Sequence, residues 1–426
     1  MKLKVVLSTA SALALLTGAA WAGSGNNAFV KQDGAGNTAK VQQAAGSGGN
    51  DFGTAGAPAL QQGNGNSIVE TQSTGGGFSR GDNDTIVLRQ VGNSNSYGSD
   101  YSNSAGGNRI NSVIQNGNSN HISIGRNAAT NSTVETVLQS GDATNTTTGS
   151  SNWLSISQSN LGALRDGNRV VLVQQLGSNN GAGSQNAVNG GTTLSQSGAN
   201  NVIMEATING DNNNPSIYNS TFGPVLSISQ KGTGNGYLSS IARMTGSNGN
   251  FIHVTETGDN NNFYVVQGID RSSTQNRATV IQTGSDNDAS ATSLGSYDTA
   301  SITEIGNSNH VKISQSGGDT NTATANITGN FNGSATVSGI AGNLASANGL
   351  VSGDILQVGA NNTATYTVLS SDNNQFAYLQ QGSGNTIDGT VTGTGSNQVA
   401  VVQVGAGNTT GFSQAGGGNN GISVSQ

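Results

Sequence analysis

Short stretches of alternating apolar and polar residues run along most of the chain. Seven-residue segments with the pattern Asn-x-apolar-x-apolar-x-Gln recur, for example at residues 37–43 and 261–267. A period of 2, bounded by glycine-containing links, is typical of short β-strands joined by tight turns. The Asn and the Gln share the parity of the apolar residues, so their amides are expected to face the core.

The links between these segments carry a second spacing, Gln-x-Gly-x-x-Asn. It occurs 12 times, against roughly 0.6 matches expected by chance from the composition. We expect the amides to form ladders and name as ladder residues Gln32, Asn37, Gln43, Gln61, Asn66, Gln90, Asn95, Gln115, Asn120, Gln196, Asn201, Gln282, Asn287, Gln380, Asn385, Gln403, Asn408 and Gln414. The predicted turn glycines are Gly34, Gly63, Gly92, Gly117, Gly198, Gly284, Gly382 and Gly405.

Amides inside a core need regular partners. An unpaired buried amide group costs about 1–3 kcal/mol, and stacking equivalent residues ~4.8 Å apart lets each amide bond the one above and below. The pattern therefore predicts an all-β fold, a β-solenoid of about 16 stacked strand-turn-strand repeats with cross-β, amyloid-like spacing.

The repeat length is nearly constant in the second half of the chain. Taking the Asn that opens each second strand as 261, 287, 309, 332, 362, 385 and 408 gives steps of 26, 22, 23, 30, 23 and 23. We interpret residues 23–426 as a single array of such repeats, with longer, irregular loops around 131–250. Variable loops on one edge are typical of solenoids.

The first 22 residues have the features of a secretory signal peptide. Lys2 and Lys4 precede a short apolar run, and an Ala-x-Ala site predicts cleavage after Ala22. No later stretch approaches the ~20 apolar residues of a membrane span. The mature chain is therefore expected to be secreted, without a membrane span.

Composition narrows the function classes. Only 9% of residues are charged, the net charge is −7 and there is no Cys. A weakly acidic chain makes nucleic acid an unfavourable partner, and stability must come from backbone ladders and packing because disulfides are absent.

Catalytic and metal-binding patterns are not found. The three histidines, His121, His253 and His310, fall at outward strand positions, and Asp residues in the links fit turn chemistry better than calcium binding. A carbohydrate-active β-helix enzyme would need a carboxylate cluster, and none stands out. We therefore expect a non-enzyme with no catalytic residue, metal or cofactor.

Five acidic residues interrupt the inward pattern. Glu70, Glu135 and Glu205 occupy the second apolar position of their segments, whereas Glu256 and Glu304 replace the terminal Gln. Burial raises the pKa of a carboxyl group, so these residues are candidate gatekeepers that couple assembly to protonation. The alternative is that the repeats are irregular there and these residues tilt towards solvent.

The unbroken string at residues 32–43, Gln-Asp-Gly-Ala-Gly-Asn-Thr-Ala-Lys-Val-Gln-Gln, closely resembles the curlin repeat of curli fibre subunits. The resemblance covers nearly the whole mature chain. It implies a functional amyloid on the surface of a Gram-negative-type bacterium, exported through a dedicated outer-membrane channel, partnered by a nucleator subunit and used in biofilm matrix, adhesion and surface attachment.

Strand pattern extends from Asn26 to Gln426, so we expect unpaired strand edges at both ends of the array and self-association into a homopolymer. A regular last repeat favours the fibre-forming subunit over the nucleator. The runner-up is a monomeric β-solenoid adhesin at the cell surface.

Overall fold

The structure is a computed structural model. It describes residues 27–43, 51–72, 84–100, 108–127, 132–141, 148, 151–159, 168–178, 180, 192–197, 202–209, 215–220, 225–233, 235, 240–245, 249–268, 274–369, 372–415 and 419–426. The expected signal peptide (residues 1–22) and its cleavage site at Ala22 lie outside these residues.

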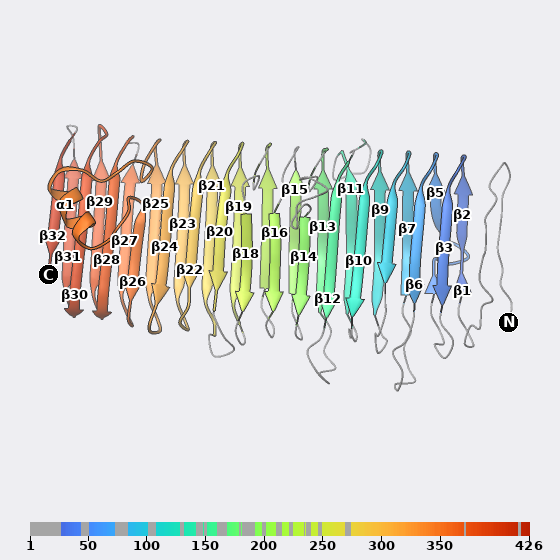
Figure 1. The fold of residues 1–426 in the computed structure, drawn as a ribbon, viewed down its shortest axis with the longest axis horizontal. Coiled ribbons are helices and arrows are strands. Elements are labelled where there is room, and N and C mark those ends of the chain that lie inside the picture. The colour runs from blue at the N-terminus through green and yellow to red at the C-terminus, as the bar shows by residue number, and fades with distance from the viewer. Residues whose placement is uncertain are drawn as a thin grey trace. The chain divides into compact units, whose positions relative to one another are not determined.

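The chain divides into two compact units, Met1–Gln230 and Lys231–Gln426. Each unit is a stack of parallel strands that alternate along the chain between two sheets, which we name sheet A and sheet B (Figure 1). The expected all-β solenoid is therefore confirmed.

In the first unit, sheet A contains β1 (Asn27–Ala28), β2 (Val30–Asp33), β4 (Asp51–Phe52), β5 (Ala59–Gln62), β7 (Asp84–Val91), β9 (Arg109–Asn116), β11 (Thr133–Ser140), β13 (Arg169–Leu176), β15 (Val202–Asn209) and β17 (Val225–Lys231), whose last residue already belongs to the second unit. Sheet B contains β3 (Thr38–Gln43), β6 (Ser67–Gln72), β8 (Ser96–Asp100), β10 (His121–Asn127), β12 (Trp153–Ser159), β14 (Thr192–Ser197) and β16 (Pro215–Ser220).

In the second unit, sheet A contains β19 (Phe251–Thr257), β21 (Arg277–Thr283), β23 (Thr299–Ile305), β25 (Thr322–Thr328), β27 (Thr363–Leu369), β29 (Thr386–Thr392) and β31 (Thr409–Ala415). Sheet B contains β18 (Ser240–Thr245), β20 (Asn262–Gln267), β22 (Asp288–Ser293), β24 (His310–Ser316), β26 (Asp354–Val358), β28 (Gln375–Ser383), β30 (Gln398–Ala406) and β32 (Gly421–Ser425).

The core lies between the two sheets and is built by period-2 alternation. In β19, Ile252, Val254 and Glu256 are buried while their neighbours are half-buried. Each residue faces its equivalent one turn later, as in the pairing of Val254 with Val280 of β21. In-register parallel pairing therefore places like residues one above another.

The number of turns is slightly lower than expected, because sheet B contributes 15 described strands, one per turn, rather than about 16. The sequence predicts one series of Asn residues, each opening the second strand of a repeat, and this series is wrong after residue 332. Asn332 stacks under Asn374, 42 residues later, whereas Asn362 stacks on Asn321, 41 residues earlier. The Asn residues thus form two series, one at each edge of the stack, and the apparent step of 30 joined the two.

A helical insertion explains this shift. Residues 333–353 follow the link after β25 and contain α1 (Gly339–Ala347) before the chain re-enters sheet B at β26. Ala341 and Ala345 of α1 pack on the outer face of β28 and β30, against Ala377, Ala400 and Val402. The alternation of apolar and polar residues did not predict this helix.

Sheet A of the first unit contains a bulge that the sequence prediction missed. β9, β11 and β13 each have eight residues, with two consecutive half-buried residues before alternation resumes. Ladder pairing passes over the extra residue, since Val134 and Thr136 are paired with β9 but Glu135 is not. The bulge reverses the inward and outward parity of the later residues in each strand, so in β13 Val173 and Gln175 point inward rather than Leu172 and Gln174.

The link glycines are required by both backbone conformation and space. Gly63 has φ 111°, and a Cβ on it would lie 1.9 Å from the carbonyl oxygen of Gly92 in the next turn. The other described link glycines that the sequence prediction named also have positive φ: Gly34, Gly92, Gly117, Gly284, Gly382 and Gly405. Gly198 lies outside the described residues.

Among the described residues, no helix is both long and apolar enough to cross a lipid bilayer.

Candidate functional site: ladders, edges and outer faces

The Gln residues of sheet A in the first unit form a continuous chain of amide hydrogen bonds. Gln32 Nε2 donates to Gln61 Oε1 (2.6 Å), Gln61 to Gln90 (3.0 Å) and Gln90 to Gln115 (2.8 Å). Each buried Gln also donates to a backbone carbonyl of sheet B, as from Gln61 to Thr38 (2.9 Å). Every amide N–H₂ in this chain therefore points in the same direction along the stack.

A second Gln ladder runs along sheet B of the second unit. It links Gln315, Gln357, Gln380, Gln403 and Gln426 by Nε2-to-Oε1 bonds of 2.9–3.1 Å. Gln380 and Gln403 consequently belong to sheet B, whereas Gln282 and Gln414 belong to sheet A. The sequence motif alone did not separate the two ladders.

The Asn residues bond both to backbone and to one another, since Asn287 Nδ2 also donates to Asn261 Oδ1 (3.0 Å). In one turn of the second unit, Asn287 N–H donates to Asn261 Oδ1 (3.1 Å), and Asn287 Nδ2 donates to the carbonyl oxygen of Gly306 (2.8 Å). Asn37, Asn66, Asn95, Asn120 and Asn385 take part in equivalent bonds. Each Asn therefore ties a link to the links before and after it.

Of the remaining predicted ladder residues, two have hydrogen bonds in the structure and two have side chains that are not described. Gln196 is buried and accepts a bond from Gln158 (2.9 Å), and Asn408 is half-buried and donates to Asn385 Oδ1 (3.0 Å). Asn201 and the side chain of Gln43 lie outside the described residues.

Two carboxyl groups enter the sheet A ladder of the second unit. Glu256, Gln282 and Glu304 occupy successive turns and are fully buried. Gln282 Nε2 donates to Glu304 Oε2 (2.8 Å), while Glu304 Oε1 is buried with no hydrogen-bond partner. Burial, above all, raises the pKa of Glu304 well above its usual value, and the nearby Asp288 and Glu256 raise it further, although the bond from Gln282 opposes the shift.

The other three acidic candidates do not share this environment. Glu70 is buried and accepts a bond from the Tyr97 hydroxyl (3.2 Å). Glu135 and Glu205 are half-buried on the outer face, so the expectation that they point inward is wrong. Glu135 accepts a hydrogen bond from Arg169 Nε (2.7 Å), and Glu205 accepts one from Thr207 (2.8 Å). The bulge is the cause in both strands, because β15 also contains it: pairing with β13 includes Ile203 and Glu205 but passes over Met204.

Gln414 of sheet A was expected to join a ladder, and that expectation is wrong within this chain. Only 6% of it is exposed, yet neither Nε2 nor Oε1 has a hydrogen-bond partner. The reason on one side is Val391 of β29, which faces Gln414 in the register and offers no polar group. On the other side, the register gives β31 no second partner strand within the described residues.

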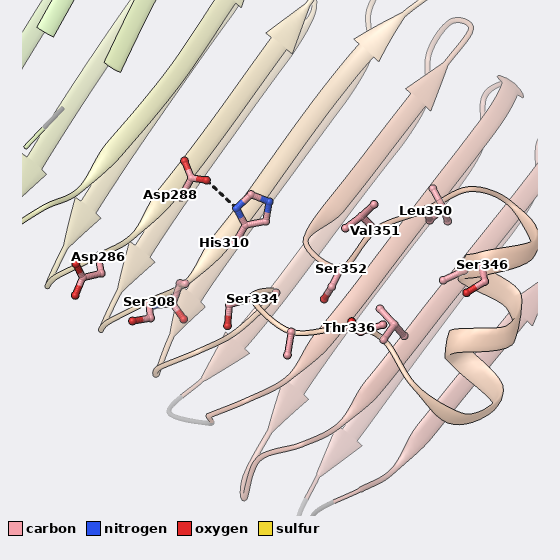
Figure 2. Close-up of a pocket in the computed structure, with 15 residues that line it drawn as sticks. Asp286, Asp288, Ser308, His310, Ser334, Thr336, Ser346, Leu350, Val351 and Ser352 are labelled. Atoms are coloured by element: carbon pink, nitrogen blue, oxygen red, sulfur yellow. Dashed lines mark hydrogen bonds and ion pairs between the residues drawn. The ribbon is translucent and has the colours of Figure 1, made fainter. Parts of the chain in front are cut away.

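The insertion creates a surface cavity on sheet B of the second unit. Its volume is about 650 Å³, and Val337 and Leu350 of the insertion line it together with Asp288 and His310. His310 Nδ1 lies 3.0 Å from Asp288 Oδ2, and these two side chains point towards each other beside the loop (Figure 2). In the described part of the chain, no group of three or more His, Cys, Asp or Glu side chains could hold a metal ion.

The outer face of sheet A in the second unit carries rows of hydroxyl side chains, which we call the threonine face. The register aligns a first row of Thr299, Thr322, Thr363, Thr386 and Thr409. A second row consists of Ser301, Thr324, Thr365 and Asp388. A third row consists of Thr303, Asn326, Thr367 and Thr390. These residues alternate with buried ones and are half-buried or exposed.

The other described outer faces differ in composition. Sheet B of the first unit aligns some hydroxyl residues, such as Ser123 with Ser155 and Ser155 with Thr193, beside His121 and Trp153. In sheet A of the first unit, the equivalent first row reads Arg109, Thr133, Arg169 and Val202. Sheet B of the second unit bears the ion pair of Lys312 with Asp354 (3.4 Å) and the apolar surface under α1. Within the described residues, the threonine face is set apart by its first row, which is Thr in five successive strands.

No family model matches this chain, and none of the curated proteins searched matches it either.

Proposed function

We propose that this chain is a structural subunit of an extracellular, curli-like amyloid fibre that supports biofilm matrix, adhesion and surface attachment. In this proposal the chain is secreted after loss of a signal peptide, passes an outer-membrane channel and is nucleated by a companion subunit. It acts without a cofactor and without chemistry of its own.

The observation that carries the proposal is Gln414. A buried amide without partners costs about 1–3 kcal/mol for each unpaired group. Val391 offers no partner within the stack. In this proposal the partner comes from a strand of a second copy that is added beside β31. Open strand edges are templates for pairing with another chain.

A second copy supplies the matching group. In β2, Gln32 Nε2 donates to Gln61, so the polarity of the ladder directs Gln32 Oε1 to the opposite side. Gln414 Nε2 of one copy would then donate to Gln32 of the next. Fibre growth in this scheme repeats the stacking found within each unit, with the same parallel register.

The first experiment is assembly of the purified mature protein. The proposal predicts thioflavin-positive fibres and a cross-β diffraction reflection at ~4.8 Å along the fibre axis. A chain that sediments as a stable monomer over days would contradict it and would favour a monomeric adhesin.

The second experiment tests the end-to-end contact. In Gln414→Val, the isolated chain should become more stable by about 1–3 kcal/mol, because an unpaired amide is removed. Seeded elongation should slow by roughly tenfold, which is about 1.4 kcal/mol, because Gln32 of the incoming copy loses its donor. Ser413→Val, an outward change in the same strand, is the matched control and should leave elongation unchanged. Equal elongation of Gln414→Val and wild type would rule out this contact.

A further inference from the structure

We propose that the threonine face is a lateral contact surface that pairs with the threonine face of a second copy and so bundles neighbouring fibres. This inference rests on the proposed fibre function. It adds a second contact, perpendicular to the growth direction.

The chemistry of the face suits pairing with an identical surface. Ten of the twelve residues that β23, β25, β27 and β29 contribute to the three rows are Thr or Ser, and Asp388 is the one ionisable group among them. With one ionisable residue among the twelve, the face can approach its own copy with little of the repulsion that separates highly charged surfaces. The hydroxyls can exchange hydrogen bonds, and the methyl groups can interdigitate.

The geometry also favours a second copy over an unrelated partner. Rows of identical side chains repeat at each turn, and a second copy has the same turn spacing by construction. Paired sheets with identical interdigitating side chains are the arrangement of steric zippers. No aromatic side chain lies in the three rows, so the face lacks the flat rings that commonly stack on ligands.

The area of the threonine face is too small for two isolated chains to pair. Five strands at ~4.8 Å and five residues at ~3.4 Å give about 400 Å² per copy. A stable interface needs about 800 Å² from each partner, so two isolated chains should not pair. In a fibre, each chain adds another copy of the face, and many weak contacts act together. Bundling should therefore appear only after fibres have formed.

The test compares two single substitutions with the same chemistry. Thr367→Lys places a positive charge at the centre of the threonine face. Thr292→Lys places the same charge at a half-buried outward position of β22 in sheet B. Fibre mass is followed by thioflavin fluorescence, and lateral pairing is followed by electron microscopy and turbidity.

We expect both variants to form fibres at the wild-type rate. In Thr367→Lys, the fraction of paired fibres should fall by roughly tenfold at low salt, because each turn of contact brings like charges together. Raising the ionic strength to ~1 M should restore pairing, since screening then acts within about 3 Å. Thr292→Lys should bundle like wild type.

The outcomes separate the two proposals. Fibres of Thr367→Lys that bundle as wild type, or an equal loss of bundling in both variants, would overturn the lateral contact and leave the fibre intact. Absence of fibres from the wild-type protein would instead overturn the proposed function. Retention of fibres on a polysaccharide matrix, with loss in Thr367→Lys and no change in bundling, would show that the face has a different partner.

Discussion

Replacing Glu304 by Gln should make the stability of the second unit less dependent on pH, while the part that comes from Asp298, whose pKa is also raised by burial, remains. Glu304 lies at full burial between Gln282 of β21 and Ile327 of β25. Ile327 offers no polar group, so only the bond from Gln282 stabilises the carboxylate within the ladder. The charged form is therefore poorly compensated, and burial raises the pKa of this carboxyl group.

The sign of the pH effect depends on this direction. Since the pKa is raised on folding, the folded state holds the proton more tightly than the unfolded state does. The resulting stabilisation is fully present below pH 4.5, the usual pKa of a Glu carboxyl, and is lost as pH rises through the folded pKa. Within that window, the free energy of unfolding should fall by up to about 1.36 kcal/mol per pH unit.

The neighbouring turns show what the substitution restores. Gln282 Nε2 donates both to Glu304 and to the carbonyl oxygen of Asn262 (3.1 Å). The register pairs Asn262 with Asp288, so an amide at position 304 should donate to the carbonyl of Asp288 in the same way. At pH 8, Glu304→Gln should therefore be more stable than wild type by about 1–3 kcal/mol. The two proteins should be equally stable at pH 4.

The measurement is urea unfolding of freshly prepared soluble protein, followed by circular dichroism from pH 4 to 8.5. In thermal melts, each kcal/mol corresponds to roughly 2–4 °C for a unit of this size. Asp388→Asn, an exposed change on the threonine face, is the control and should keep the wild-type pH profile. A Glu304→Gln variant with the wild-type slope, or one less stable at pH 8, would refute the reasoning.

Three further substitutions test the ladders and links. Asn287→Ala should lower the free energy of unfolding by about 1–3 kcal/mol for each backbone group that it leaves unpaired, and the midpoint of denaturant unfolding should fall. A change below 0.5 kcal/mol, roughly the scatter of surface substitutions, would count against the Asn ladder. Gly63→Ala should prevent the native turn because the added Cβ meets a backbone oxygen, whereas Gly98→Ala should be tolerated because its Cβ would have no heavy atom within 4 Å. Equal protease resistance of the two variants would contradict this prediction. Tyr97→Phe removes the hydroxyl that donates to buried Glu70 and should lower stability by about 1–3 kcal/mol; no change would mean that other partners of Glu70 suffice.

The pattern of the sequence was sufficient for the class of fold and for most inward positions. Period-2 alternation with amides at fixed ends leaves few solutions other than in-register stacking. Gln61, Gln90 and Gln380 accordingly lie in the core with like neighbours. The positive φ of the link glycines is also a direct consequence of their spacing.

The sequence failed where one residue changes the parity of a strand. Glu135 looks inward when alternation is counted without interruption, but a bulge is invisible to a period-2 count. Only pairing with β9 and β13 reveals the extra residue. The exposed ion pair with Arg169 is a consequence of that register.

By itself, the sequence determined that amides recur at core positions and must find partners one turn away, because burial without a partner is too costly. The tertiary structure alone decided which edge each Asn joins, which sheet each Gln ladder follows and which hydroxyl rows share a face. These depend on how an insertion such as residues 333–353 shifts the chain from one sheet to the other, and that choice is made by long-range pairing rather than by local pattern.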